Sequence, residues 1–251
     1  MGFLTALYQT YEQAEKDGLV DKHEGQNTVL LPIYHSSLKS EGNNIIRIYL
    51  TKNSVLVNAE FVPQDQVIVF PVTEESAGRT SSNCPHPLVD KMSYIIPKGE
   101  KQNLIYHEGL DAWYNSTTDI FARNYLSIVR KYLESENLFE DILSKLFGPN
   151  QYRIGEGKDV DKVFYEEDGK EKNFMWRDCF LTFSVIAFED KNNVNVTNSK
   201  KLHEAYIHYI NSLEYPMALC NISGKYERVC QKHRGLLGNA KLVSVSSNKE
   251  T

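Results

Sequence analysis

The pattern of apolar residues predicts a helix first and a group of strands after it. Between Phe3 and Ala14 apolar residues recur three and four positions apart, and Gly18 ends the pattern. This spacing predicts an amphipathic helix whose apolar side packs in the core. Short runs rich in β-branched and aromatic residues follow, and they predict an antiparallel meander that the helix packs against. The predicted strands are residues 29–34, 45–50, 54–62 and 67–72.

The second half of the chain combines helices with one long strand. Residues 117–119 predict a helix start, and another predicted helix runs from Leu138 to a stop at Gly148. Residues 178–188 form the most continuous apolar run, and their β-branched and aromatic side chains predict a buried strand. A capping pair at residues 198–199 predicts the last helix.

Together these elements predict an α+β fold with a mostly antiparallel sheet and packed helices. A chain of 251 residues that is 41% apolar can bury a real core, so we assign residues 1–251 to one domain. The polar stretch at residues 148–172 is a candidate sub-boundary. Residues 74–87 are small, polar or proline, and they predict a long loop of the functional or mobile kind.

The composition limits the cellular compartments in which we expect the protein to function. No apolar run reaches the roughly 18 residues that a membrane span requires. The start of the chain lacks the basic and apolar regions of a signal peptide. Four cysteines without a secretory signal favour free thiols over disulfides. We therefore expect a cytoplasmic protein without a membrane partner.

Charge separates one segment from the rest of the chain. The formal net charge is −5, which argues against a protein that coats nucleic acid with its whole surface. Residues 225–249 are the exception, because they hold six Lys or Arg against one acid. Cations beside Gly235 and Gly238 can bring charge and bare backbone N–H groups close to phosphate. Residues 132–171 hold eleven acids against five Lys or Arg, and we expect them to face away from nucleic acid.

The last segment also carries an ordered series of motifs. A Cys-x-x-Ser-Gly turn is followed by a basic stretch, a glycine-spaced loop and a Leu-Val-Ser run. This order resembles the signature region of the large subunit of the type I-C CRISPR effector complex (Cascade), with a shorter glycine loop. An upstream block at residues 78–90 and the opening helix resemble the N-terminal part of the same family. The matching residues are Gly78, Arg79, Thr80, Ser81, Pro85, Leu88 and Asp90 upstream, and Cys220, Ser223, Gly224, Lys232, His233, Gly235, Gly238, Ala240, Leu242, Val243 and Ser244 in the last segment.

The resemblance implies a non-catalytic subunit that recognises the protospacer-adjacent motif (PAM) in double-stranded target DNA. It also implies contacts with the 5′ handle of the guide RNA, with the target DNA backbone and with neighbouring Cascade backbone subunits. Cleavage would belong to a recruited helicase-nuclease, and we expect no cofactor and no metal. Because the family's subunit is larger than this chain, we expect the chain to be its N-terminal part.

Two segments are candidate nucleic-acid-binding sites. Residues 79–83 place side chains that bond to phosphates and base edges in the loop after a sheet. Residues 225–241 supply cations that neutralise phosphates, and the glycine loop at 235–241 is the alternative to the 79–83 loop for reading base edges or groove shape. We assign His208 and Tyr209 to the core or the surface rather than to base stacking. The candidate binding residues are Arg79, Thr80, Ser81, Ser82, Asn83, Lys225, Arg228, Lys232, His233, Arg234, Gly235, Gly238, Asn239 and Lys241.

The spacing of cysteines and histidines does not favour a metal site. Cys220 and Cys230 are ten residues apart, with His233 nearby, whereas zinc ligands usually come in pairs two to four residues apart. His203 and His208 are five residues apart, which puts them about 140° apart around a helix. Two side chains so arranged cannot bind one metal ion from one face.

Two other functions fit the sequence. One is a scaffold subunit that grips guide RNA or neighbouring subunits without reading the PAM. The other is a small nuclease or RNA-processing enzyme that uses His107, Glu108 or His233 as an acid or base. We interpret His107, Glu108 and Asp111 instead as a cluster in a loop and a helix start.

Overall fold

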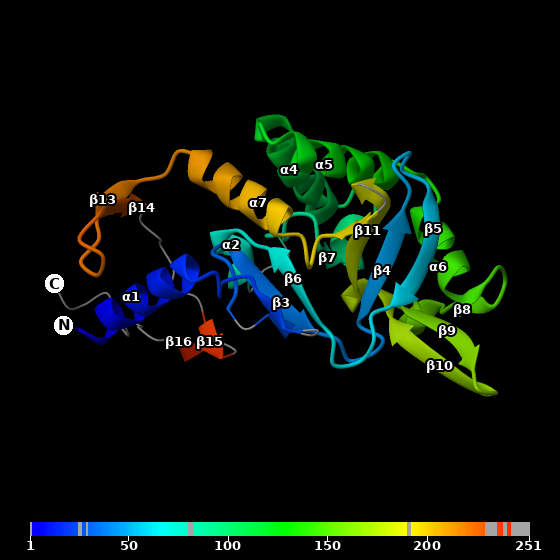
Figure 1. Cartoon of the computed structure of the whole chain (residues 1–251). Helices are drawn as coiled ribbons and strands as arrows, with labels where there is room; N and C mark the ends of the chain where they lie inside the picture. The colour runs from blue at the N-terminus through cyan, green and yellow to red at the C-terminus, as the bar shows by residue number, and fades with distance from the viewer. Residues whose placement is uncertain are drawn as a thin grey trace.

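The computed structural model describes residues 2–24, 27–28, 30–79, 83–189, 192–228, 235–237 and 240–241. Helices and strands mix along the chain, and most strand pairs are antiparallel (Figure 1), so the predicted α+β class is confirmed. The helices are α1 (Phe3–Lys16), α2 (Glu74–Ala77), α3 (Met92–Ile95), α4 (Lys101–Ser116), α5 (Ile120–Leu133), α6 (Leu138–Phe147) and α7 (Lys200–Ser212), with 3₁₀ turns η1 (Gly157–Asp159) and η2 (Trp176–Asp178).

The strands form one larger sheet and several small ones. A three-stranded sheet has the order β10-β9-β8, and the other small sheets are the pairs β1–β2, β3–β6, β13–β14 and β15–β16. The strands are β1 (His23–Glu24), β2 (Asn27–Thr28), β3 (His35–Lys39), β4 (Ile45–Leu50), β5 (Leu56–Phe61), β6 (Val67–Pro71), β7 (Asp90–Lys91), β8 (Tyr152–Ile154), β9 (Lys162–Glu167), β10 (Lys170–Met175), β11 (Phe180–Glu189), β12 (Asn192–Asn195), β13 (Met217–Leu219), β14 (Tyr226–Arg228), β15 (Gly235–Leu237) and β16 (Ala240–Lys241).

A five-stranded sheet forms the centre of the molecule, in the order β12-β11-β4-β5, with β7 paired to β11. Strands β4 and β11 run parallel, and the other pairs in this sheet are antiparallel. Strand β4 is buried along most of its length and β11 along its first half, as their continuous apolar runs require. The strand predictions at 45–50, 54–62, 67–72 and 178–188 are confirmed as β4, β5, β6 and β11.

The predicted strand at 29–34 and the meander order are wrong. The strand begins at His35 instead, and β3 pairs with β6, while β5 pairs with β4. Pro32 has no N–H to give to a ladder, and Tyr34 has a left-handed backbone with φ of 59°. The chain therefore turns before it extends, and the four strands divide between two sheets.

Helices cover the sheet and close the core. Helices α4, α5 and α7 pack on one another, and α6 packs against β5. Tyr125 on α5 donates a hydrogen bond of 2.8 Å from its hydroxyl to the carbonyl of Phe183 on β11. Asp119 caps α5 by accepting from the backbone N–H of Ala122 at 2.7 Å. The predicted helices at α5, α6 and α7 are confirmed, whereas α4 was not predicted.

Helix α1 has the predicted position in the chain but not the predicted packing. Ala14 is the one buried residue of this helix, and the side of Phe3 and Leu7 faces solvent, with Phe3 68% exposed. Its links to other segments include a hydrogen bond of 2.9 Å from the Tyr11 hydroxyl to the carbonyl of Leu31. The prediction that this apolar face packs in the core is therefore wrong.

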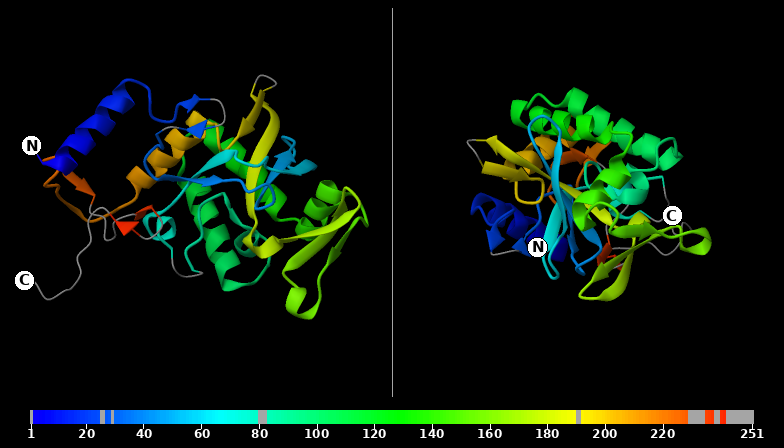
Figure 2. Two further views of the ribbon diagram at one scale, coloured as in Figure 1. Left: turned by 90° about the horizontal axis from the view of Figure 1, so that it is seen from below. Right: turned by 90° about the vertical axis from the view of Figure 1, so that its right-hand side faces the viewer.

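The molecule is elongated, with different elements at its two ends. Figures 1 and 2 place α1 and the β13–β14 pair at one end and the three-stranded β8–β9–β10 sheet at the other. Within the residues that the structure describes, none of the helices combines the length and apolar character that a membrane crossing requires.

Candidate nucleic-acid interface

The loop after α2 is held at both ends by Arg79. Thr73 and Ser76 form a capping box that starts α2, so the predicted loop opens with one short helix. The Arg79 guanidinium then donates two hydrogen bonds to the carboxylate of Asp90, at 2.7 and 2.6 Å. It also donates to the carbonyl of Cys84 at 3.2 Å and lies over the ring of Tyr94, 4.5 Å from its centroid. One side chain therefore fixes the start, middle and end of the loop.

Asp90 is a deeply buried anchor. Its side chain is 0% exposed, and it accepts further hydrogen bonds from the backbone N–H groups of His86 and Lys91, at 2.6 and 2.7 Å. Burial raises the pKa of the Asp90 carboxyl above its ordinary value, while the Arg79 guanidinium and the two N–H donors oppose that rise. Because the Arg79 cation is paired with the Asp90 carboxylate, Arg79 has a structural role in this loop.

Few of the other predicted loop residues fall within the described structure. Thr80, Ser81 and Ser82 lie outside the described residues. Asn83 is described and exposed, at the point where the chain continues into Cys84 and the two prolines that follow. The loop prediction therefore stays a prediction for residues 80–83, with its anchor now defined.

The Cys-x-x-Ser-Gly motif is the turn of the β13–β14 hairpin. The backbone N–H of Cys220 donates to Lys225 at 2.8 Å, and that of Gly224 donates to Cys220 at 2.8 Å. Gly224 has φ of 70°, a conformation that glycine adopts without steric cost. The Ser223 hydroxyl donates to Glu227 at 2.9 Å. The motif residues thus build a local turn that presents the basic segment after it.

Two predicted cations of this hairpin form ion pairs with distant acids. Lys225 pairs with Glu12 of α1 at 2.8 Å and donates to the hydroxyl of Tyr8 at 3.1 Å. These contacts raise the pKa of Lys225 and lower that of Glu12. Arg228 pairs with Glu74 of α2 at 3.6 Å. Both cations fasten the hairpin to other elements.

The remaining predicted residues of the basic segment are only partly described. Lys232, His233, Arg234, Gly238 and Asn239 lie outside the described residues. The backbones of Gly235 and Lys241 are opposite each other in the β15–β16 pair. Figures 1 and 2 place this pair at the α1 end of the molecule.

The structure joins the described starts of the two predicted segments, β14 and the helix before the 79–83 loop. The Arg228–Glu74 pair joins β14 to α2, and α2 leads directly into the 79–83 loop. A hollow of about 260 Å³ lies beside this junction, and Asn83 and Tyr215 are among its lining residues. The Arg228 guanidinium lies 3.1 Å from the centroid of the Tyr215 ring. Tyr215 could not be singled out from the sequence, because its contact with Arg228 depends on how the hairpin folds back.

A family model described as CRISPR-associated protein (Cas_Csd1) matches residues 7–250. The chain belongs to this family. The match spans most of α1, the loop after α2 and the basic segment, and it confirms the predicted CRISPR association. No curated protein matches the chain.

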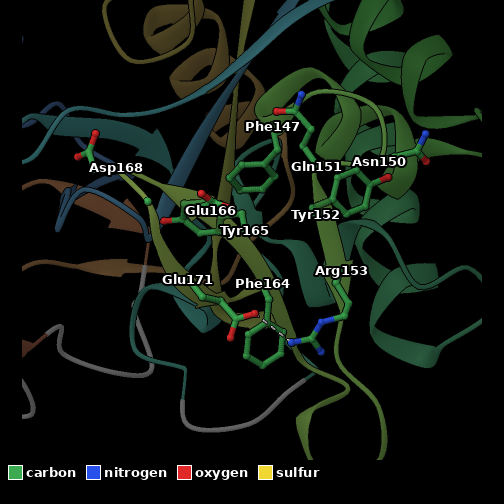
Figure 3. A pocket seen from close by; sticks show the side chains of 11 residues that line it. Phe147, Asn150, Gln151, Tyr152, Arg153, Phe164, Tyr165, Glu166, Asp168 and Glu171 are labelled. Carbon is green, nitrogen blue, oxygen red and sulfur yellow. Dashed lines mark hydrogen bonds and ion pairs between the residues drawn. The ribbon is translucent and has the colours of Figure 1, made fainter.

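A second hollow of this Cas_Csd1 chain lies at the opposite end, between the end of α6 and the β8–β9–β10 sheet (Figure 3). It measures about 710 Å³. The Arg153 guanidinium stands 4.1 Å from the Phe164 ring centroid and pairs with Glu171 at 3.4 Å. With Glu166 and Asp168 also in the lining, acids outnumber cations there. This hollow does not suit phosphate, in agreement with the charge of residues 132–171.

The acid–base candidates lie inside a helix of the Cas_Csd1 chain. His107, Glu108 and Asp111 are in the middle of α4, so the interpretation as a loop and helix start is wrong. Arg130 donates to Asp111 at 2.6 Å, and burial lowers the pKa of His107. His203 is buried, and its ring nitrogens lie within hydrogen-bond distance of the Asp21 carboxylate and the Val196 carbonyl. Among the described residues, no group of three or more His, Cys, Asp or Glu side chains is placed to hold a metal ion.

Proposed function

We propose that this Cas_Csd1 chain is a non-catalytic part of the large subunit of a type I-C CRISPR surveillance complex, and that it recognises the PAM in double-stranded DNA. The observation that supports the proposal is the Arg228–Glu74 ion pair, which joins β14, in the basic segment, to α2, the helix that precedes the loop at 79–83. Family membership supplies the CRISPR context. The chain would act in the cytoplasm with guide RNA and the Cascade backbone subunits.

The cations of the basic segment would hold the duplex in register. Lys225 is 59% exposed although it is paired, and Lys232, Arg234 and Lys241 follow it in sequence. Each contact with a phosphate releases counterions, so affinity falls as salt rises. Glu12 pairs with Lys225 and Glu74 pairs with Arg228, and these pairs orient the hairpin. Phosphate binding would therefore fall mainly to the residues after Arg228.

The loop would supply the sequence readout. The Arg79–Asp90 pair holds both ends of the loop to the core, so that residues 80–83 approach a groove from a fixed base. Hydroxyl and amide groups can bond to base edges, and the minor groove has a degenerate pattern of them. Such readout would tolerate some variation in the PAM. Local opening of the duplex then lets the guide RNA test complementarity, and a recruited helicase-nuclease would cut.

A scaffold function is the alternative, and the pairing of Lys225 and Arg228 with acids of the same chain favours it. Asn83→Ala in the assembled guide-RNA complex separates the two. If the loop reads bases, the ratio of affinities for PAM and scrambled-PAM duplexes falls about 5-fold or more. Asn150→Ala, an exposed asparagine in the hollow at the opposite end, is the matched control. A scaffold keeps the ratio unchanged in both variants.

A further inference from the structure

The hollow beside Asn83 has aromatic walls in fixed positions. We call it the α4–α7 pocket, and its lining includes Tyr209 and Leu213 of the α7 region, Tyr215, Gly109 of α4, and Asn83. The Tyr209 ring stacks on Trp113 with centroids 6.3 Å apart and an angle of 22°. The Tyr215 ring is held by the Arg228 guanidinium. Both rings are therefore placed by neighbours outside the pocket before any ligand arrives.

Gly109 gives the pocket an open side. It lies in the interior of α4, where glycine is less favourable than alanine. No heavy atom lies within 4 Å of the position that a Cβ would take there. Packing therefore does not require a glycine, and the missing side chain leaves free space in the pocket wall.

The lining combines flat apolar surface with a few polar groups. Pro85 and Pro87 join the tyrosines, while the Glu75 carboxylate and the Asn83 amide add an acceptor and a mixed donor and acceptor. A volume of about 260 Å³ is below the roughly 300–1,000 Å³ of sites for drug-sized ligands. The space suits one planar ring system. Glu75 and its neighbour Glu74 disfavour a phosphate inside.

We propose that the α4–α7 pocket binds a single nucleobase that has left its stack, while its phosphates stay outside the pocket. This inference rests on the proposed function for the presence of nucleic acid at this face. Aromatic rings bind unpaired bases through their π faces, whatever the base. A carboxylate acceptor adds a preference for bases with an exocyclic amino group over thymine or uracil. Tyr209, which the sequence assigned to the core or the surface, would be one stacking wall.

Gly109 offers a direct test in the assembled guide-RNA complex. Gly109→Leu fills the pocket, and Gly109→Ala is the matched control that keeps most of the space. Loss of a stacked base lowers affinity for the nucleic acid that carries it, target DNA or guide RNA, by about 5- to 150-fold, so both affinities are measured. We expect a loss in this range for Gly109→Leu and for Tyr209→Ala, and less than about twofold for Gly109→Ala. Thermal melting of each variant establishes that it is folded.

Abasic probes identify the base and its source. One abasic site is moved along the DNA strands next to the PAM, and in a second series along the 5′ handle of the guide RNA. At the position whose base enters the pocket, the difference between wild type and Gly109→Leu disappears. A position in the DNA series assigns the base to DNA, and one in the RNA series assigns it to the guide.

The outcomes of this test are separable from those of the proposed function. If wild type discriminates the PAM while Gly109→Leu binds both target DNA and guide RNA as wild type does, the pocket inference is overturned and the proposed function stands. The pocket inference is also overturned if Gly109→Leu loses the same affinity, relative to wild type, on every abasic probe. If wild type shows no PAM discrimination, the proposed function fails, and position-specific coupling in the RNA series still decides whether the pocket holds a base.

Discussion

The Arg79 guanidinium and the Asp90 carboxylate form a bidentate ion pair, with N–O distances of 2.7 and 2.6 Å. The Arg79 side chain is 14% exposed and the Asp90 side chain 0%. An arginine predicted to touch nucleic acid is thus part of the support of its own loop. Effects of its substitution on DNA binding have to be separated from effects on folding.

Arg79→Ala should lower the free energy of unfolding by about 3–5 kcal/mol, because it leaves a buried carboxylate without its partner. Urea unfolding followed by circular dichroism measures the change. Arg79→Lys keeps the charge but loses the two-pronged geometry, so its loss should be smaller. A loss below about 1 kcal/mol for Arg79→Ala, the value for exposed pairs, would contradict the supporting role.

Gly224→Ala should destabilise the β13–β14 hairpin by about 1–2 kcal/mol, since φ of 70° is unfavourable for a residue with a Cβ. Amide hydrogen exchange at Cys220 and Gly224, whose N–H groups bond within the turn, reports the local change. Gly78→Ala is the control, because Gly78 has φ of −122° and open space around it. Equal exchange in the two variants would show that the turn does not need glycine.

Cys220 should react with iodoacetamide faster than Cys179. Hydrogen bonding from the Ser223 backbone lowers the pKa of the Cys220 thiol, whereas burial raises that of Cys179. Mass spectrometry of a variant in which Cys84 and Cys230 are serine follows the two thiols separately. Faster labelling of Cys179 would contradict the structure around both residues.

His107 should make stability depend on pH. Burial lowers its pKa below the ordinary 6.5, so the folded protein holds the neutral ring while the unfolded chain takes up a proton near that pH. This contribution is present above about pH 6.5 and is lost as the pH falls below it. In His107→Gln, unfolding free energy should decline less steeply between about pH 7 and pH 5. Identical slopes would show that the histidine is not desolvated.

Much of the fold could be predicted from local patterns. Continuous apolar runs located β4 and β11, and Asp119 and Gly148 marked where α5 begins and α6 ends. The order in which the strands pair could not be predicted, because β3 pairs with β6 rather than with the next strand along the chain. Helix α4 was missed because glycine and polar residues interrupt the apolar positions that it buries.

Sequence reasoning could propose where the candidate site lies, but not which of its residues are paired within the chain. Charge located the basic segment, yet the partners of its first cations lie far away in sequence, as with Glu12 and Lys225. Only the folded chain shows which cations are already paired. The packing of α1 was predicted wrongly for the same reason. The spacing of its apolar residues predicts an apolar face, but not which segment covers that face.

The most direct test of the proposed function is duplex binding by the guide-RNA complex, assembled with and without this chain. Target DNA with a PAM is compared with the same DNA carrying a scrambled PAM, between about 50 and 200 mM salt. We predict affinity that depends on both the PAM and the chain, and a salt slope that falls by about one with Lys232→Ala. Affinity that is unchanged by the PAM, by omission of the chain and by the substitution would contradict PAM recognition.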